Sequence, residues 1–145
     1  MTKDVLVRVK GTQFMDDEND VIEMITAGTF NEKNGKKYLI YDETIVEGGD
    51  QTHNIVKIWP DKVTKRGLVD THMTFECGKK HMCNYMTPVG LIILGITTSA
   101  LEVEEDETSM GIVISYALEM NGEYISGCGL EIYARDKGNG PWSLD

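Results

Sequence analysis

The chain has few cysteines and no long apolar run, and both scarcities exclude classes of protein. Its three cysteines, Cys77, Cys83 and Cys128, are an odd number without C-x-x-C spacing. Such cysteines are typical of reduced thiols in a cytosol, not of a disulfide framework. The most apolar run, residues 91–96, has about a third of the roughly 20 residues that a membrane-spanning helix needs. Charged residues interrupt the apolar residues near the N-terminus, so no secretory signal is predicted. We therefore expect a cytoplasmic protein.

Positive charge is also scarce. The 145 residues include 14 Lys and Arg against 24 Asp and Glu, which gives a net charge of −10. Binding to nucleic acids and to anionic lipid surfaces depends on Lys and Arg close to phosphate groups. We therefore expect no nucleic-acid partner and no membrane partner.

Short segments rich in Val, Ile, Thr and Tyr make up most of the chain. In residues 110–120 the large apolar side chains alternate with smaller or more polar ones, which is the period of a half-buried strand. Turn signals separate the segments at residues 16–20, 31–37, 47–51, 59–62, 65–67, 77–80, 87–90, 104–109 and 120–123. This pattern predicts an all-β fold of about ten strands without a helix.

The architecture follows from the short connections. Consecutive hairpins make antiparallel neighbours, and a meander of many strands avoids exposed edges by closing on itself. We predict a closed up-and-down antiparallel β-barrel of about 8–10 strands, with a two-sheet sandwich as the alternative. Residues 1–135 are expected to form a single barrel domain, and residues 136–145 a C-terminal tail.

Two hairpins allow the strand register to be predicted. A tight turn at residues 34–35 places Phe30 beside Leu39 and Gly28 beside Tyr41, so that the aromatic side chains share a face.

In the hairpin around Gly122, the apolar residues occupy even positions on both sides of the connection. Only a loop of odd length keeps both sets on one face. We therefore predict a three-residue connection with Gly122 in a G1 bulge and Glu119 paired with Glu123.

Several short pieces of the sequence occur in the order found in a known family. They are "RG" at residues 66–67, Phe75, "YMTPVG" at residues 85–90, Thr97 and "GIVISY" at residues 111–116. With these pieces the chain resembles, over most of its length, the YwiB-like family of small bacterial proteins of unknown function. The resemblance implies a calycin-type, lipocalin-like β-barrel. It carries over no catalytic residue, because the family has no established activity.

Four potential metal ligands, His72, Cys77, His81 and Cys83, lie within twelve positions, and Cys and His are the ligands that zinc prefers. On a hairpin the two cysteines share an apolar face with Phe75 only if His72 points to the other side. The four side chains then do not converge on one ion. We expect no metal site, and we predict that Cys77, Cys83 and Cys128 all lie on inner faces.

Motifs for enzymatic chemistry are scarce. The acidic runs at residues 16–20 and 102–107 lack the alternating spacing of a calcium loop. The chain also has no nucleophile elbow, phosphate loop or dinucleotide fingerprint. We expect no cofactor and no catalytic residue, although an acid/base pair among the 24 carboxylates stays open.

Both faces of residues 91–96 are apolar, whereas a barrel strand needs only its inner face buried. We predict that Ile92, Leu94 and Ile96 form the outer face. A second subunit of a homodimer or the tail around Trp142 would then cover them.

The ligand hypothesis rests on aromatic residues and one arginine. Predicted inward-facing aromatic side chains supply apolar area and hydroxyl groups, and an arginine at a barrel rim can anchor a polar head group. If the barrel interior binds a small amphipathic ligand, the predicted site consists of Arg66, Phe75, Tyr85, Thr87, Tyr116 and Tyr124. Two other hypotheses stay open, a non-catalytic scaffold that forms homo-oligomers or binds proteins, and an enzyme with an unrecognised site. A barrel of this size is either filled by side chains or holds one small ligand, and the sequence does not distinguish the two.

Overall fold

The computed structural model describes residues 2–14, 19–44, 51–59, 61–67 and 72–136. These residues form ten antiparallel strands, as the alternating pattern predicts. In chain order the strands are β1 (Thr2–Phe14), β2 (Asn19–Lys33), β3 (Lys36–Thr44), β4 (Gln51–Ile58), β5 (Val63–Arg66), β6 (His72–Phe75), β7 (Lys80–Thr87), β8 (Gly90–Glu105), β9 (Ser109–Met120) and β10 (Glu123–Asp136). In this part of the chain no helix is long and apolar enough to cross a membrane.

The strands form a nearly closed up-and-down barrel, which confirms the predicted fold class. The hydrogen-bonded order is β6-β5-β4-β3-β2-β1-β10-β9-β8-β7, so the first and last strands pair with each other. Within the described residues the ring is interrupted between β6 and β7. The turn at residues 76–79 partly bridges this seam, because Gly78 N donates to Thr98 O at 2.8 Å and Thr98 N donates to Lys79 O at 3.2 Å.

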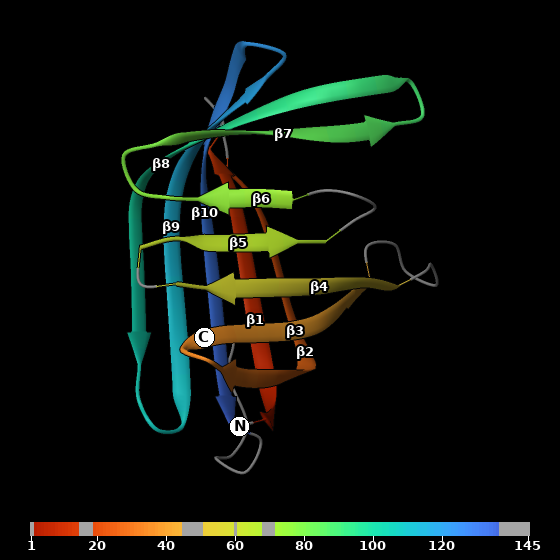
Figure 1. The fold of residues 1–145 in the computed structure, drawn as a ribbon. Helices are drawn as coiled ribbons and strands as arrows, with labels where there is room; N and C mark the ends of the chain where they lie inside the picture. The colour runs from red at the N-terminus through yellow and green to blue at the C-terminus, as the bar shows by residue number, and fades with distance from the viewer. Residues whose placement is uncertain (1, 15–18, 45–50, 60, 68–71, 137–145) are drawn as a thin grey trace.

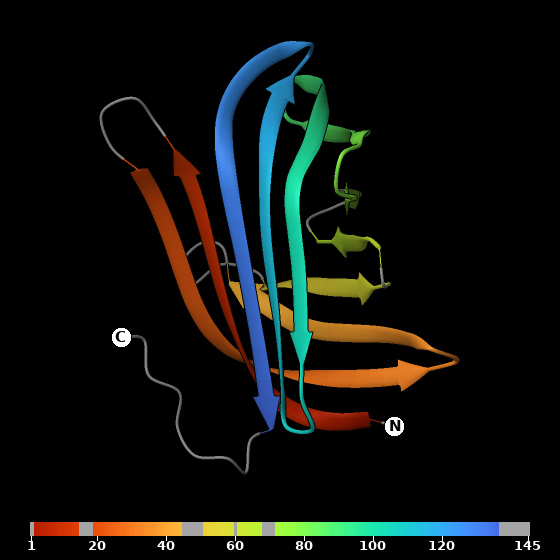
Figure 2. The same ribbon diagram turned by 90° about the vertical axis from the view of Figure 1, so that its left-hand side faces the viewer.

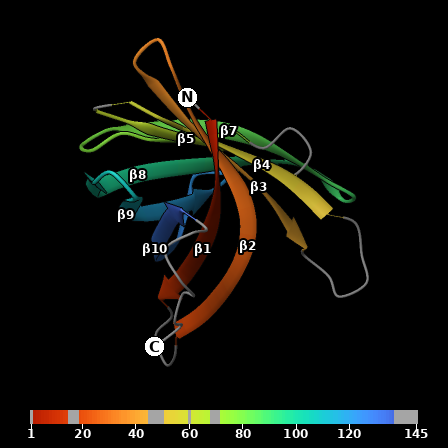
Figure 3. The same ribbon diagram turned by 90° about the horizontal axis from the view of Figure 1, so that it is seen from below.

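The barrel is flattened into two crossing layers. Figure 1 shows β3 to β6 running across the direction of β8 to β10. The long strand β2 bends strongly and passes from one layer to the other (Figure 2). Seen from below, β8, β9, β10, β1 and β2 form one curved wall (Figure 3).

The core lies between the layers and follows the alternation of the strands. In β1, Val5, Val7 and Val9 face inward and are at most 8% exposed. The same alternation supplies the rest of the core, which comprises Phe30, Leu39, Tyr41, Val56, Ile58, Val63, Phe75, Ile96, Met110, Ile112, Ile114, Leu130, Ile132 and Ala134.

The predicted turn at residues 34–35 is confirmed. Asn34 and Gly35 both have positive φ, at 55° and 77°, as a type I′ hairpin requires. Phe30 pairs with Leu39, Gly28 pairs with Tyr41, and both aromatic side chains are buried.

The predicted three-residue connection at Gly122 is wrong. Met120 pairs with Glu123 across a two-residue turn, and Asn121 and Gly122 have φ of 51° and 87°. Asn tolerates this left-handed conformation, so the type I′ turn that matches the twist of the strands forms here. The extra residue that keeps the apolar side chains of both strands on one face lies instead within β10, where the register shifts between Tyr124 and Ser126.

The predicted faces of residues 91–96 are reversed. Ile96 is fully buried and belongs to the core, and Ile92 and Leu94 on the same face are partly buried. Leu91 and Ile93 face outward and are 50% and 41% exposed. Both faces are apolar, so the alternation alone does not distinguish inside from outside. The set that pairs with the inward residues of β9 takes the core.

Gly28 gives a test of the packing between β1, β2 and β3. A Cβ at Gly28 would lie 2.6 Å from the carbonyl oxygen of Ile40 and 2.8 Å from a methyl group of Val7, whereas a Cβ at Gly11 would meet nothing within 4 Å. We expect Gly28→Ala to lower the free energy of unfolding by about 1–3 kcal/mol, because a well-packed core resists an added methyl group. Gly11→Ala is the matched control, and denaturant unfolding measures both. Equal stability of the two variants would contradict the described packing.

Candidate functional site

A cavity begins where the row of inward-facing valines in β1 ends. The alternation that places Val5, Val7 and Val9 in the core continues to Gly11, which has no side chain. Gly11 pairs with Ile22 of β2 on one side and with Leu130 of β10 on the other. Space is therefore left between these strands at the end of the barrel that carries the β1–β2 and β9–β10 connections.

The cavity has a volume of about 540 Å³ and is open to solvent. Its wall comes from β1, β2, β9 and β10, and consists of Gly11, Thr12, Gln13, Asp20, Val21, Ile22, Tyr116, Leu118, Cys128, Gly129 and Leu130. Ile22 is 72% exposed, because the inner face of β2 is uncovered at this end. The size and the largely apolar lining are those of a site for a small molecule.

Polar groups form a chain along one side of this cavity. Gln13 Nε2 donates to Ser126 Oγ at 2.9 Å, and Ser126 Oγ lies 3.6 Å from Cys128 Sγ. The Tyr116 hydroxyl interacts with the same sulfur atom. The pKa of Tyr116 is raised well above its ordinary value, mainly because the hydroxyl group is buried. The contact with Cys128 raises it further. The phenol therefore stays protonated and available as a hydrogen-bond donor.

Two aromatic rings lie beneath the cavity. The Tyr116 ring packs against the Phe75 ring with centroids 5.1 Å apart and planes tilted by 59°. Phe75 is fully buried and belongs to β6, whereas Tyr116 belongs to β9, so the two rings meet across the barrel interior. Side chains thus fill the middle of the barrel, and space for a ligand begins above Tyr116.

The structure brings together some of the predicted site residues and separates others. Tyr116 lines the cavity and Phe75 lies beneath it. Tyr124, predicted to face inward, is 68% exposed, because it precedes the bulge that restores the inward phase of β10. Arg66 is exposed at the end of β5. Tyr85 and Thr87 lie in β7, but their side chains fall outside the described part of the structure.

Lys65 lies on the interior face of β5 in place of Arg66. It is two residues beyond the fully buried Val63 and pairs with Val56 of β4, which is also fully buried. Its Nζ donates to the Oδ1 of Asn54 at 3.2 Å, and the Asn54 side chain is 1% exposed. A Cβ at Gly67 would lie 2.4 Å from that oxygen atom. Glycine at this position therefore leaves room for the buried amide.

Sequence reasoning missed most of the cavity wall. Gly11, Gln13 and Ser126 were not predicted as site residues, and Cys128 was predicted only as a buried thiol. One signal was present in the sequence, because the inward series of β1 changes from valine to Gly11.

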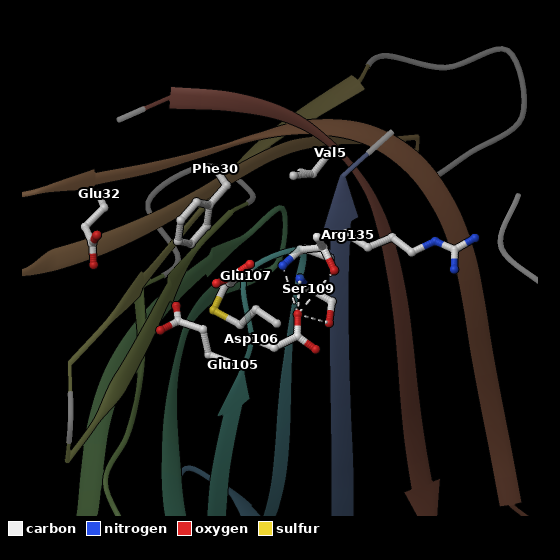
Figure 4. Close-up of a pocket in the computed structure, with 11 residues that line it drawn as sticks. Val5, Phe30, Glu32, Glu105, Asp106, Glu107, Ser109 and Arg135 are labelled. Carbon is white, nitrogen blue, oxygen red and sulfur yellow. Dashed lines mark hydrogen bonds between the residues drawn. The ribbon is translucent and has the colours of Figure 1, made fainter. Parts of the chain in front are cut away.

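A smaller cavity of about 180 Å³ lies at the other end of the barrel (Figure 4). Acidic residues surround it, including Glu32, Glu105 and Asp106. Asp106 Oδ1 accepts hydrogen bonds from the backbone N–H groups of Thr108 at 2.9 Å and Ser109 at 2.8 Å. These bonds lower the pKa of the Asp106 carboxyl group, and the bond from Thr108 has the largest effect. The Asp106 carboxylate therefore stabilises the β8–β9 turn.

The predicted burial of all three thiols is wrong for one of them. Cys128 is buried and Cys83 is partly buried, but Cys77 is exposed. Cys77 follows the end of β6 at Phe75 and lies in the turn, so strand alternation does not extend to it. Among the described residues no group of three or more His, Cys, Asp or Glu side chains is arranged to hold a metal ion.

A nearly closed antiparallel meander with core side chains through its middle is a calycin-like barrel. The chain belongs to a family described as "Domain of unknown function (DUF1934)", whose model matches residues 7–132. This match confirms the resemblance noted in the sequence.

The chain is also similar to a solved protein, described as the crystal structure of ywiB protein from Bacillus subtilis. The two are 23% identical, with a TM-score of 0.79 over 93% of this chain and 92% of that chain. At this identity the likeness establishes the shared fold. No curated protein matches the chain.

The three thiols should differ in reactivity. We expect the exposed Cys77 to react rapidly with an aromatic disulfide reagent in the native protein, and Cys128, which is 7% exposed in the cavity wall, to react much more slowly. Burial raises the pKa of the Cys83 thiol, so its labelling is slow at neutral pH and accelerates as the pH rises. Cys77→Ser should remove the fast phase. A fast phase that persists in this variant would place a second thiol at the surface.

Proposed function

We propose that this protein binds a small amphipathic ligand in the cavity at the open end of its barrel. The observation that carries the proposal is the space beside Gly11, where an inward-facing position without a side chain adjoins a chain of hydrogen-bonding groups. The apolar part of the ligand would lie against Ile22, Leu118 and Leu130. Its polar group would exchange hydrogen bonds with Gln13 and Tyr116.

Charge around the cavity favours an uncharged or cationic ligand. Among the described residues of the wall, Asp20 is the one Asp, Glu, Lys, Arg or His side chain, and the whole chain carries a net charge of −10. Arg66, predicted to anchor a polar head group, is exposed on the face of β5 opposite to Val63. An anion would therefore enter against the field of the protein.

The proposed role is binding without catalysis. The described wall contains no His, Lys or Arg that could activate the Cys128 thiol, and Tyr116 stays in its neutral form. We place this role in the cytoplasm of a bacterial cell. The free thiols of all three cysteines and the similar barrel from Bacillus subtilis support that location.

A fluorescence titration with the uncharged probe N-phenyl-1-naphthylamine tests the proposal. We expect saturable binding, displacement by decanol or decylamine, and little displacement by decanoate. Gly11→Leu should weaken probe binding at least tenfold, which corresponds to about 1.4 kcal/mol, because the new side chain occupies the cavity without meeting a neighbour at its Cβ.

Ala27→Leu is the matched control, since it adds a similar side chain at an exposed position of β2. It should leave binding unchanged. Absence of saturable binding to the wild-type protein, or equal loss in both variants, would contradict the cavity as the binding site.

A further inference from the structure

Exposed apolar side chains also form a strip on the outer surface of the barrel at its open end. Phe14 of β1 is 51% exposed, Tyr124 of β10 is 68% exposed, and Met82 of β7 is 56% exposed. Leu91 and Ile93 of β8 are 50% and 41% exposed. We call these five residues the outer strip. Scattered apolar residues are normal on a protein surface, whereas a contiguous group indicates a contact.

The strand register makes the strip continuous. Phe14 is paired with Gly127, and a Cβ at Gly127 would lie 3.8 Å from the Phe14 ring and 4.0 Å from the Tyr124 hydroxyl oxygen. Tyr124 pairs with Glu119, which in turn pairs with Gly95 of β8. Gly127 carries no side chain, so the surface between Phe14 and Tyr124 is low. Gly95 is covered instead, because the side chains of Glu119, Lys80 and Met82 lie over it.

Hydrogen bonds hold the hairpins beneath the strip together. Asn121 N donates to Ile93 O at 2.8 Å, and Ile93 N donates to the Asn121 Oδ1 at 3.0 Å. The β9–β10 turn is thereby fixed to β8. A partner that docks here would meet a preformed surface and would order little of it on binding.

Charge on the strip differs from charge on the rest of the chain. Residues 77–101, which include all of β7 and most of β8, contain no Asp or Glu, although the chain has 24 of them in 145 residues. Lys80 Nζ lies 2.6 Å from Glu119 Oε2 in the middle of the strip. This ion pair thus places one positive and one negative charge among the five residues of the outer strip, within a protein of net charge −10.

We propose that a second copy of this chain docks on the outer strip to form a two-fold symmetric dimer. In such an interface the same patch faces itself, so it must be self-complementary. The strip meets this condition, because a two-fold rotation can place Lys80 near the partner's Glu119 while the apolar residues cover one another. Elsewhere the acidic surfaces of two copies would repel. The cavity lies on the inner face of the same wall, so the dimer does not require the ligand.

Sedimentation equilibrium at micromolar concentration tests the dimer. We expect the wild-type protein to sediment at twice its mass of 16.2 kDa. Ile93→Glu should weaken association at least tenfold, because it places a carboxylate in an apolar contact. Ile25→Glu is the matched control, since Ile25 is 38% exposed on β2 and lies outside the strip. It should leave the dimer intact.

Two further variants keep the test decisive. Tyr124→Ser removes the most exposed member of the strip and should also weaken the dimer. This variant takes the place of Ile93→Glu if Ile93→Glu fails to fold. Lys80→Glu should weaken association, and adding Glu119→Lys should restore it, because the exchanged pair is again self-complementary. A monomeric wild-type protein, or equal weakening by Ile93→Glu and Ile25→Glu, would overturn the proposal, whatever the outcome of the probe titration.

Discussion

The pairing of the first strand with the last is the interaction on which the rest of this structure depends. It runs from Val5 opposite Asp136 to Phe14 opposite Gly127 and joins two sets of hairpins into one curved wall. Without it, Gly11 would have no neighbour at Leu130, and Gln13 would not reach Ser126. Both the enclosed core and the cavity above it follow from this ladder, because each strand of a barrel needs a partner on both sides to satisfy its backbone groups.

Alternation in the sequence predicted most of the fold, since a strand with one apolar face has a defined inside. It correctly placed Phe30 and Tyr41 on one face of their hairpin and Tyr116 inside the barrel. The prediction failed where the backbone had a second way to keep the apolar residues on both sides of a turn on the same face. A loop of odd length and a bulge within the strand have the same effect on distant residues, but only the bulge leaves Tyr124 on the outside. The faces of residues 91–96 were reversed for a related reason, because both are apolar.

The cavity itself could not be predicted from composition, since it results from one missing side chain among strands distant in sequence.

One wall carries both proposed functions, because successive residues of a strand point to opposite sides. Gln13 belongs to the cavity and Phe14 to the outer strip, and the same is true of Cys128 and its neighbour Gly127. Glycine has a different consequence on each side. On the inner face Gly11 leaves a space that a small molecule can fill, whereas on the outer face Gly127 leaves a low area between Phe14 and Tyr124 that a broad partner surface can cover. The bulge near Tyr124 contributes to both faces, because it places the Tyr124 side chain outside the barrel while Cys128 stays inside.

The position of the seam has a consequence for how the chain reaches its native state. Gln13 and Ser126 are hydrogen-bonded although they are 113 positions apart, whereas β6 and β7, which are consecutive, are not paired. During synthesis on a ribosome, β1 emerges early and must wait for the last hairpin before its second edge is covered. Until then an apolar edge strand is open to wrong partners. Proteins dominated by such distant pairings fold on a timescale of roughly milliseconds to seconds, so closure of this barrel is expected to be a late and slow event.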